Sequence, residues 1–173
     1  MADETALVQE ARSGQSKALA QLLQDNYRMV LGYFMKITLH NQPLAEDLTQ
    51  ETMIQAIEKF RLYDPKYKFS TWLITMGTNI FRDQLRRQKI AAKSSVEYWE
   101  AQQADQELDL ELSNDLRAAL GGLPEEKRIT LVLKYFYDYS YEEIAAIIKV
   151  PVGTVRSRLH NGIHDLQKVL EEQ

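Results

Sequence analysis

The stretch from Ser140 to Leu170 constrains the fold of this chain most, because it holds two amphipathic patterns separated by a proline. Ser140 is a suitable N-cap for the first helix, and Glu143 stands where the reciprocal partner of a capping box belongs. Pro151 ends that helix, because proline cannot continue it and biases the residue before it away from helical geometry.

A second helix is expected to restart near Val152. Its apolar residues recur at helical spacing and predict one inward face, formed by Val155, Leu159, Ile163, Leu166 and Leu170. Its other side carries short or basic donors close to the helix start, namely Thr154, Arg156, Ser157, His160 and Asn161. Two helices, a tight turn and such donors predict a DNA-binding helix-turn-helix.

The formal net charge of −4 is unusual for a DNA-binding chain, so the distribution of charge matters more than its total. Residues 61–93 hold eight basic and two acidic side chains, whereas residues 94–126 hold nine acidic and one basic. Residues 45–60 are also acidic, with four acidic side chains against one basic. This segregation allows one surface to hold nucleic acid while other surfaces repel it.

Several classes are disfavoured by composition. The chain has no cysteine, which excludes disulfides and thiolate metal sites and fits a reducing compartment. No apolar run reaches the length of a membrane span, and the N-terminus lacks the layout of a signal peptide. A cytoplasmic chain without membrane insertion is therefore expected.

The first half of the chain predicts helices over residues 3–13, 16–37, 44–60 and 70–88. In the 44–60 helix, Ala45, Thr49, Met53, Ala56 and Phe60 share a face that can be buried. Its outer face carries Asp47, Gln50, Glu51, Ile54 and Glu58. An ordinary solvated face explains the acids alone, but an apolar Ile54 among them is typical of a protein-docking surface.

The loop over residues 61–69 is rich in lysine and aromatic residues, and the next helix is expected to be capped by Ser70 or Thr71. One side of that helix carries Trp72, Thr75, Asn79, Arg82, Arg86 and Lys89. Rings and guanidinium groups in one stripe suit single-stranded nucleic acid, because bases stack on the rings and arginines follow the phosphates. The alternative is a buried tryptophan beside a solvated basic face.

These motifs occur together in a set order: Ala45–Glu51, Phe69–Leu73, Asn79 with Arg86 and Arg87, Leu123–Pro124, Ser140–Ala145 and Gly153–Leu159. In this order the chain resembles a bacterial sigma factor of the extracytoplasmic-function (group IV) type, over nearly its whole length. The resemblance implies an all-α fold with two small helical domains, 1–92 and 113–173. An acidic flexible linker, 93–112, would join them, and the second domain would contain the helix-turn-helix.

The resemblance also implies partners and site residues. Core RNA polymerase would bind through the clamp helices of its largest subunit, and the flap region of its second-largest subunit is a further contact. Docking on the clamp helices would use Asp47, Gln50, Glu51 and Ile54. The −10 promoter element, melted to single strands, would be bound by Tyr63, Lys66, Tyr67, Lys68, Phe69, Trp72, Asn79, Arg82, Arg86 and Arg87. The −35 element would be bound by Thr154, Arg156, Ser157, Arg158, His160 and Asn161. An anti-sigma factor is a further candidate partner, and no cofactor is expected.

One departure from the family pattern concerns Asn161-Gly162-Ile163, where such factors usually carry a basic–alanine–basic run. Glycine inside a helix costs about 1 kcal/mol relative to alanine. Two positive charges near the DNA backbone are also missing. Weak or unusual −35 binding is therefore expected.

Two other classes of protein fit the sequence less well. A free-standing helix-turn-helix regulator, reading a palindrome as a dimer, would leave residues 44–89 without a purpose. A metalloenzyme would rest on His160 and His164, spaced as ligands often are, but neither the zinc-protease pattern nor a third ligand accompanies them. The sequence therefore predicts a protein that is not an enzyme and has no metal site.

Overall fold

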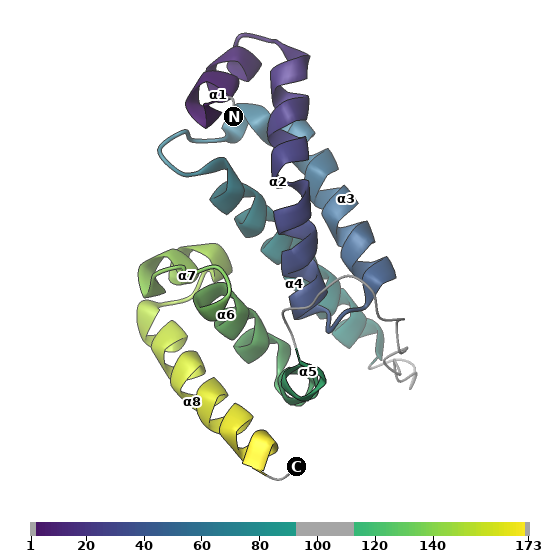
Figure 1. The fold of residues 1–173 in the computed structure, drawn as a ribbon, viewed down its shortest axis with the longest axis vertical. Coiled ribbons are helices and arrows are strands. Elements are labelled where there is room, and N and C mark those ends of the chain that lie inside the picture. Colours follow the sequence, from purple (N-terminus) through teal and green to yellow (C-terminus); the bar gives the residue numbers. More distant parts are fainter. Residues whose placement is uncertain (1–2, 93–112, 172–173) are drawn as a thin grey trace. The chain divides into compact units, whose positions relative to one another are not determined.

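The computed structural model describes residues 3–92 and 113–171. Within these residues the chain forms α-helices and one 3-10 turn and no strand, which confirms the all-α prediction (Figure 1). The elements are α1 Glu4–Arg12, α2 Ser16–Ile37, α3 Gln42–Lys59, η1 Phe60–Leu62, α4 Phe69–Ala92, α5 Asn114–Gly121, α6 Glu125–Tyr135, α7 Tyr141–Ile148 and α8 Val152–Glu171. Tertiary contacts divide them into two units, with residues 3–34 and 43–92 in the first and residues 35–42 and 113–171 in the second. The expected linker, 93–112, lies outside the described residues.

The core of the first unit forms where α2, α3 and α4 turn their apolar faces inward. The predicted inner face of the 44–60 helix is confirmed, since all five of its members are buried, four of them in α3 and the last in η1: Ala45, Thr49, Met53, Ala56 and Phe60. Thr49 and Thr52 lie in this core because each hydroxyl donates to the carbonyl four residues earlier, at 2.7 Å in both cases. Tyr33 and Thr78 join α2 to α4 through a buried hydroxyl pair 2.7 Å apart.

Gly77 allows α4 to approach α2 and α3 closely. A Cβ at this position would lie 2.7 Å from Phe34 Cζ and 3.0 Å from Thr52 Oγ1, closer than van der Waals contact permits. Gly77→Ala is therefore expected to destabilise the first unit by about 1–3 kcal/mol, a typical cost of overfilling a core. Urea denaturation measures this change.

Gly153→Ala provides the matched control, because nothing lies within 4 Å of a Cβ at that helical position. Alanine should there raise stability by up to about 1 kcal/mol through its helix propensity. If both substitutions shifted the urea midpoint in the same direction, the close approach of the helices at Gly77 would not explain the effect of Gly77→Ala on stability.

The start of α4 differs from the sequence prediction. The helix begins at Phe69 rather than after a cap at Ser70 or Thr71. The Phe69 N–H donates to Glu4 Oε1 at 3.1 Å. Glu4 lies in α1. A cap supplied by a residue 65 positions away leaves no local pattern in the sequence.

The second unit contains the helix-turn-helix as predicted, with α7 and α8 as its two helices (Figure 1). The capping box is confirmed: Glu143 N–H donates to Ser140 Oγ at 3.2 Å, and Ser140 N–H donates to Glu143 Oε2 at 2.8 Å. The first helix ends slightly before the proline, because Lys149 adopts a left-handed conformation with φ of 55°. Pro151 then lies just ahead of α8.

The apolar face of α8 is buried only in its first half. Val155 and Leu159 are buried at 0% and 2% exposure, whereas Leu170 is 45% exposed. The prediction of one inward stripe through Leu170 is therefore wrong for the last turns. Three helices, α5, α6 and α7, pack on α8, yet they leave its last apolar side chain uncovered.

Arg128 is a buried cation at the junction of α5 and α6. Its side chain is 7% exposed, and its Nη1 donates to the carbonyls of Leu120 and Leu123 at 3.3 and 3.4 Å. These carbonyls lie at the end of α5 and in the following turn, where helices leave acceptors unsatisfied. Burial lowers the pKa of Arg128, yet these acceptors allow the charge to remain in the core.

Lys127 and Asp165 tie α6 to α8, with Nζ and Oδ2 only 2.6 Å apart. This hydrogen bond lowers the pKa of Asp165 below its ordinary 3.8. A lowered carboxyl pKa contributes stability that is present above the unfolded value and lost as the pH falls through the folded value. Asp165→Asn is therefore expected to lower the thermal unfolding midpoint at pH 7, with the difference from wild type shrinking as the pH falls below about 4 toward the lower folded pKa.

Thermal unfolding followed by circular dichroism at a series of pH values measures this effect. Asp138→Asn is the control, because Asp138 is fully exposed and lies 3.8 Å from its lysine partner. A constant difference between Asp165→Asn and wild type from pH 7 to pH 3 would contradict the assignment.

Candidate functional site

The outer face of α3 places together the four residues predicted for polymerase docking. Asp47, Gln50 and Glu51 are exposed, and Ile54 is 56% exposed among them. The structure adds Ile57, which follows Ile54 by one helical turn and is 55% exposed. The sequence analysis missed Ile57, although its absence from the inner face of the same helix was a usable signal.

Four aromatic rings form a cluster at the junction of α3, the loop and α4. Tyr63 lies 5.3 Å from both Phe69 and Trp72, and Phe69 lies 5.5 Å from Trp72, measured between ring centroids. Phe60 adds contacts to Tyr63 and Phe69 at 6.1 and 6.3 Å. Tyr63 and Phe69 are buried, whereas Trp72 is half-buried and keeps part of its surface open to solvent.

The loop itself presents polar and aromatic side chains to the surroundings. Lys66 and Lys68 are exposed, and Tyr67 is 64% exposed. A turn shapes its tip, because Asp64 Oδ1 accepts from Lys66 N–H at 3.0 Å and Asp64 O accepts from Tyr67 N–H at 3.1 Å. Leu62, at 77% exposure just before the loop, is a further exposed apolar residue that the sequence analysis did not single out.

The buried phenol of Tyr63 fastens the loop from within. Its Oη donates to the carbonyl of Tyr67 at 2.6 Å. Burial raises the pKa of Tyr63, with the Glu4 carboxylate adding to the effect. The phenol therefore stays protonated and keeps donating this hydrogen bond at neutral pH.

The stripe along α4 runs from half-buried to exposed residues. Asn79 and Arg82 are half-buried, and Asn79 Nδ2 donates to Thr75 O at 2.7 Å. Arg86 and Arg87 are exposed, and Arg86 pairs with Asp83 at 2.9 Å on the surface. An exposed pair of this kind contributes little to stability, so Arg86 can exchange its partner for a phosphate.

Most of the residues predicted for the −35 element share the exposed face of α8. Arg156, Ser157, His160 and Asn161 are exposed, and Thr154 is half-buried. Arg158 differs, because its Nη1 lies 2.7 Å from Glu126 Oε2 and its side chain is 22% exposed. That ion pair ties α8 to α6.

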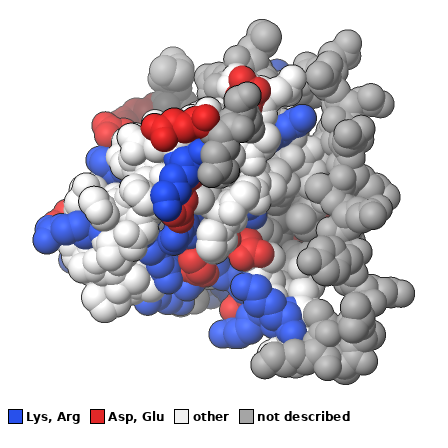
Figure 2. All heavy atoms as spheres, turned by 90° about the horizontal axis from the view of Figure 1, so that it is seen from below, with Lys and Arg blue, Asp and Glu red and all other residues white. Residues whose placement is uncertain are grey.

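Lysine and arginine side chains lie interspersed with acidic ones on the face shown in Figure 2.

Gly162 occupies a buried position where α8 packs on α6. A Cβ there would lie 3.0 Å from Leu131 Cδ1 and 3.3 Å from its Cγ. The glycine therefore has a structural reason, since it lets the two helices approach closely. The close packing of α8 on α6 offsets part of the cost of a glycine inside a helix.

Residues 3–92 and 113–171 hold no group of three or more His, Asp or Glu side chains able to bind a metal ion. No helix within these ranges is long and apolar enough to cross a membrane.

Comparison with known proteins agrees with this geometry. The family model for sigma-70 region 2 matches residues 22–90, and the model for sigma-70 region 4 matches residues 113–166. The chain is 32% identical to the ECF RNA polymerase sigma factor SigW of Bacillus subtilis, over 95% of each chain. It is 40% identical to the ECF RNA polymerase sigma factor SigE of Mycolicibacterium smegmatis, over 75% of this chain and 53% of that protein.

A solved structure also matches: the sigma factor RpoE of Bartonella quintana, in complex with the anti-sigma factor NepR. It superposes with a TM-score of 0.78 at 25% identity, over 90% of this chain and 98% of that one. Two helical units matching regions 2 and 4 define a sigma-70-type factor. The chain belongs to the ECF RNA polymerase sigma factors, and it is an alternative sigma factor that directs transcription initiation.

Proposed function

We propose that this sigma factor docks on core RNA polymerase through the outer face of α3, captures the melted −10 element with the 63–69 loop and α4, and reads the −35 element with α8. The same proposal includes domain boundaries at residues 92 and 113, a cytoplasmic location and the absence of enzymatic activity. The observation that carries the proposed docking on polymerase is the exposure of Ile54. This side chain is 56% exposed among charged side chains, on a helix whose other face is buried.

The docking surface combines apolar area with acidic charge. Ile54 and Ile57 supply the apolar part, and Asp47 and Glu51 supply the charge. Association of this kind buries an apolar centre inside a polar rim. The proposed partner surface is the clamp-helix coiled coil of the largest polymerase subunit, which the acidic residues would meet through basic side chains.

The −10 surface suits a strand whose bases have left the duplex. A base captured by the loop would rest against the open side of Trp72, and the loop lysines with Arg82, Arg86 and Arg87 would follow the phosphates. Opening a few base pairs costs a few kcal/mol, and trapping a flipped base in a fitted pocket offsets that cost. Recognition and melting are then one event.

The −35 surface would place Arg156, Ser157 and His160 near base edges and Thr154 near a phosphate. Asn161 is exposed on this face but carries no charge. Asn161→Arg is therefore expected to strengthen binding to a −35 duplex and to steepen its salt dependence by about one unit. Fluorescence anisotropy at several salt concentrations checks this, and equal slopes for the two proteins would refute it.

The solved relative is bound to an anti-sigma factor. We include a partner of this kind in the proposal.

Run-off transcription on genomic fragments, with purified core RNA polymerase, tests the proposed function. The chain should direct initiation at discrete sites that core alone does not use. A gel shift without polymerase separates this function from that of a free-standing regulator. Weak binding that core enzyme strengthens is expected, whereas tight binding by the chain alone would favour the regulator.

A further inference from the structure

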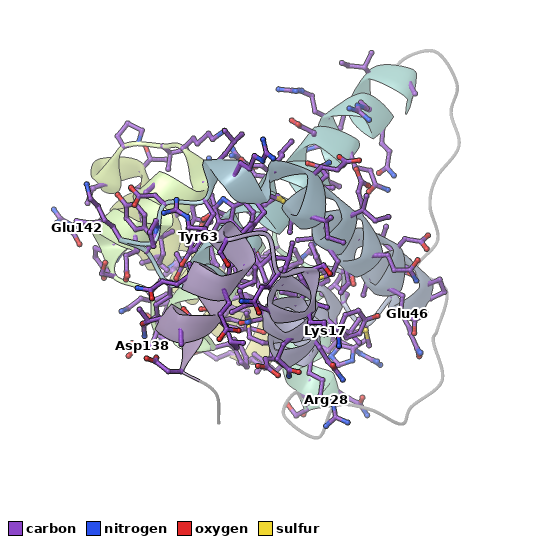
Figure 3. The ribbon with its side chains drawn as sticks, turned by 90° about the horizontal axis from the view of Figure 1, so that it is seen from above. Lys17, Arg28, Glu46, Tyr63, Asp138 and Glu142 are labelled. Atoms are coloured by element: carbon purple, nitrogen blue, oxygen red, sulfur yellow. The ribbon has the colours of Figure 1, made fainter. Side chains whose placement is uncertain are left out.

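The short helix α1 contacts the 63–69 loop at both of its ends. At the first end, Arg12 Nη2 donates to the carbonyl of Tyr63 at 3.0 Å. At the second end, Glu4 Oε1 accepts from the backbone N–H of Phe69 at 3.1 Å. Figure 3 shows Tyr63 beside this helix. The two contacts bracket the exposed part of the loop, which runs from Asp64 to Lys68.

Each contact satisfies a backbone group that the loop cannot satisfy locally. The Phe69 N–H is one of the unpaired donors at the start of α4, and a carboxylate there also interacts favourably with the helix dipole. The Tyr63 carbonyl follows η1, where the backbone leaves helical geometry with ψ of 126°. Hydrogen bonds to charged groups are about twice as strong as neutral ones, so both contacts resist thermal opening.

The helix that makes these contacts is itself fixed in position. Val8 buries α1 against the first unit at 4% exposure. Asp3 caps its start by accepting from Thr5 N–H at 3.2 Å, and Gly14, with φ of 96°, turns the chain after its end. Glu4 and Arg12 therefore act on the loop from a rigid support.

We propose that α1 sets the shape of the base-capturing loop, with Glu4 and Arg12 as positioning residues for −10 recognition. This inference rests on the function proposed above for the loop. Neither residue has to touch DNA. Their effect is to hold Tyr63 and Phe69 at a set separation, so that Lys66, Tyr67 and Lys68 present one pocket instead of several.

The experiment uses the full chain assembled with core RNA polymerase and a duplex promoter library randomised across the −10 element. Bound promoters are sequenced, which gives the preference for each base. Glu4→Ala and Arg12→Met remove one contact each. Glu4→Gln and Arg12→Lys keep an acceptor or a donor at the same place and should restore most of the preference. Glu10→Ala and Arg28→Met make the same changes at exposed positions without these contacts.

The expected result is a preference at the captured base that falls about tenfold in Glu4→Ala and in Arg12→Met. Affinity for core polymerase and for an isolated −35 duplex should stay within about twofold of wild type. The control variants should match wild type in all three measurements, and the conservative variants should keep most of the −10 preference.

Unchanged −10 preferences in both variants would overturn the proposal. So would an equal loss of core binding, −35 binding and −10 preference, or failure of both variants to fold, because each shows a general structural role. A wild-type holoenzyme that enriched no −10 sequence would instead remove the function proposed for the loop.

Discussion

Replacing Ile54 with aspartate is expected to weaken binding to core RNA polymerase by at least about a hundredfold, which corresponds to about 2.7 kcal/mol or more. Ile54 is the apolar centre of the outer face of α3 and is 56% exposed, so its replacement does not disturb the buried face. A charge there would have to be desolvated in the complex, next to the carboxylates of Asp47 and Glu51. Titration of labelled core polymerase with the chain measures the change.

Leu62→Asp is the matched control for this substitution. Leu62 is also a large exposed apolar residue of the first unit, at 77% exposure, but it lies outside the α3 face. It should leave the affinity for core polymerase unchanged. If the two variants bound core polymerase equally well, the docking surface would have to be sought elsewhere on the chain.

Removing the ring of Trp72 is expected to reduce open-complex formation roughly tenfold to a hundredfold, because a base stacked on an aromatic ring contributes about 1–3 kcal/mol. Asn79→Ala should act in the same direction with a smaller effect. Binding of the closed duplex promoter should change much less in both variants. Permanganate footprinting, which reports unpaired thymines, separates melting from binding.

Ile90→Ala is the control, because Ile90 is an exposed apolar residue of the same helix, at 66% exposure and away from the aromatic cluster. Trp72 also contacts the rings of Tyr63 and Phe69, so the unfolding midpoint of Trp72→Ala must be measured alongside. A permanganate footprint indistinguishable from wild type would count against the proposed role of the ring.

The parts of the fold that could be predicted from the sequence are those whose signals are local. Helical periodicity identified the buried face of α3, and the pair Ser140 and Glu143 identified the start of α7. Each of these depends on residues within a few turns of one another. The family resemblance was equally accessible, because it is carried by short motifs in a set order.

The rest depends on contacts between residues far apart in the chain. Glu4 caps α4 and Arg12 holds Tyr63 over separations of 65 and 51 residues. The pairing of Arg158 with Glu126 spans 32 residues and ties α8 to α6. Gly162 likewise has its structural reason in Leu131, which lies 31 residues earlier in the chain. Tertiary neighbours, which no local pattern reveals, decided each case.

Most of the exposed residues on α3 and α8 were predicted from the sequence, with Ile57 as an exception, and their assignment to polymerase and to DNA stays a prediction. Only binding measurements on variants separate a docking surface from an ordinary solvated one.

The most direct test of the account is the association of the purified chain with bacterial core RNA polymerase, measured by titration of labelled core enzyme and repeated with Ile54→Asp. A saturable submicromolar complex with the wild-type chain, lost in the variant and able to initiate at discrete promoters, is the predicted result. A chain that stayed unbound at micromolar concentrations of core enzyme would contradict the central claim.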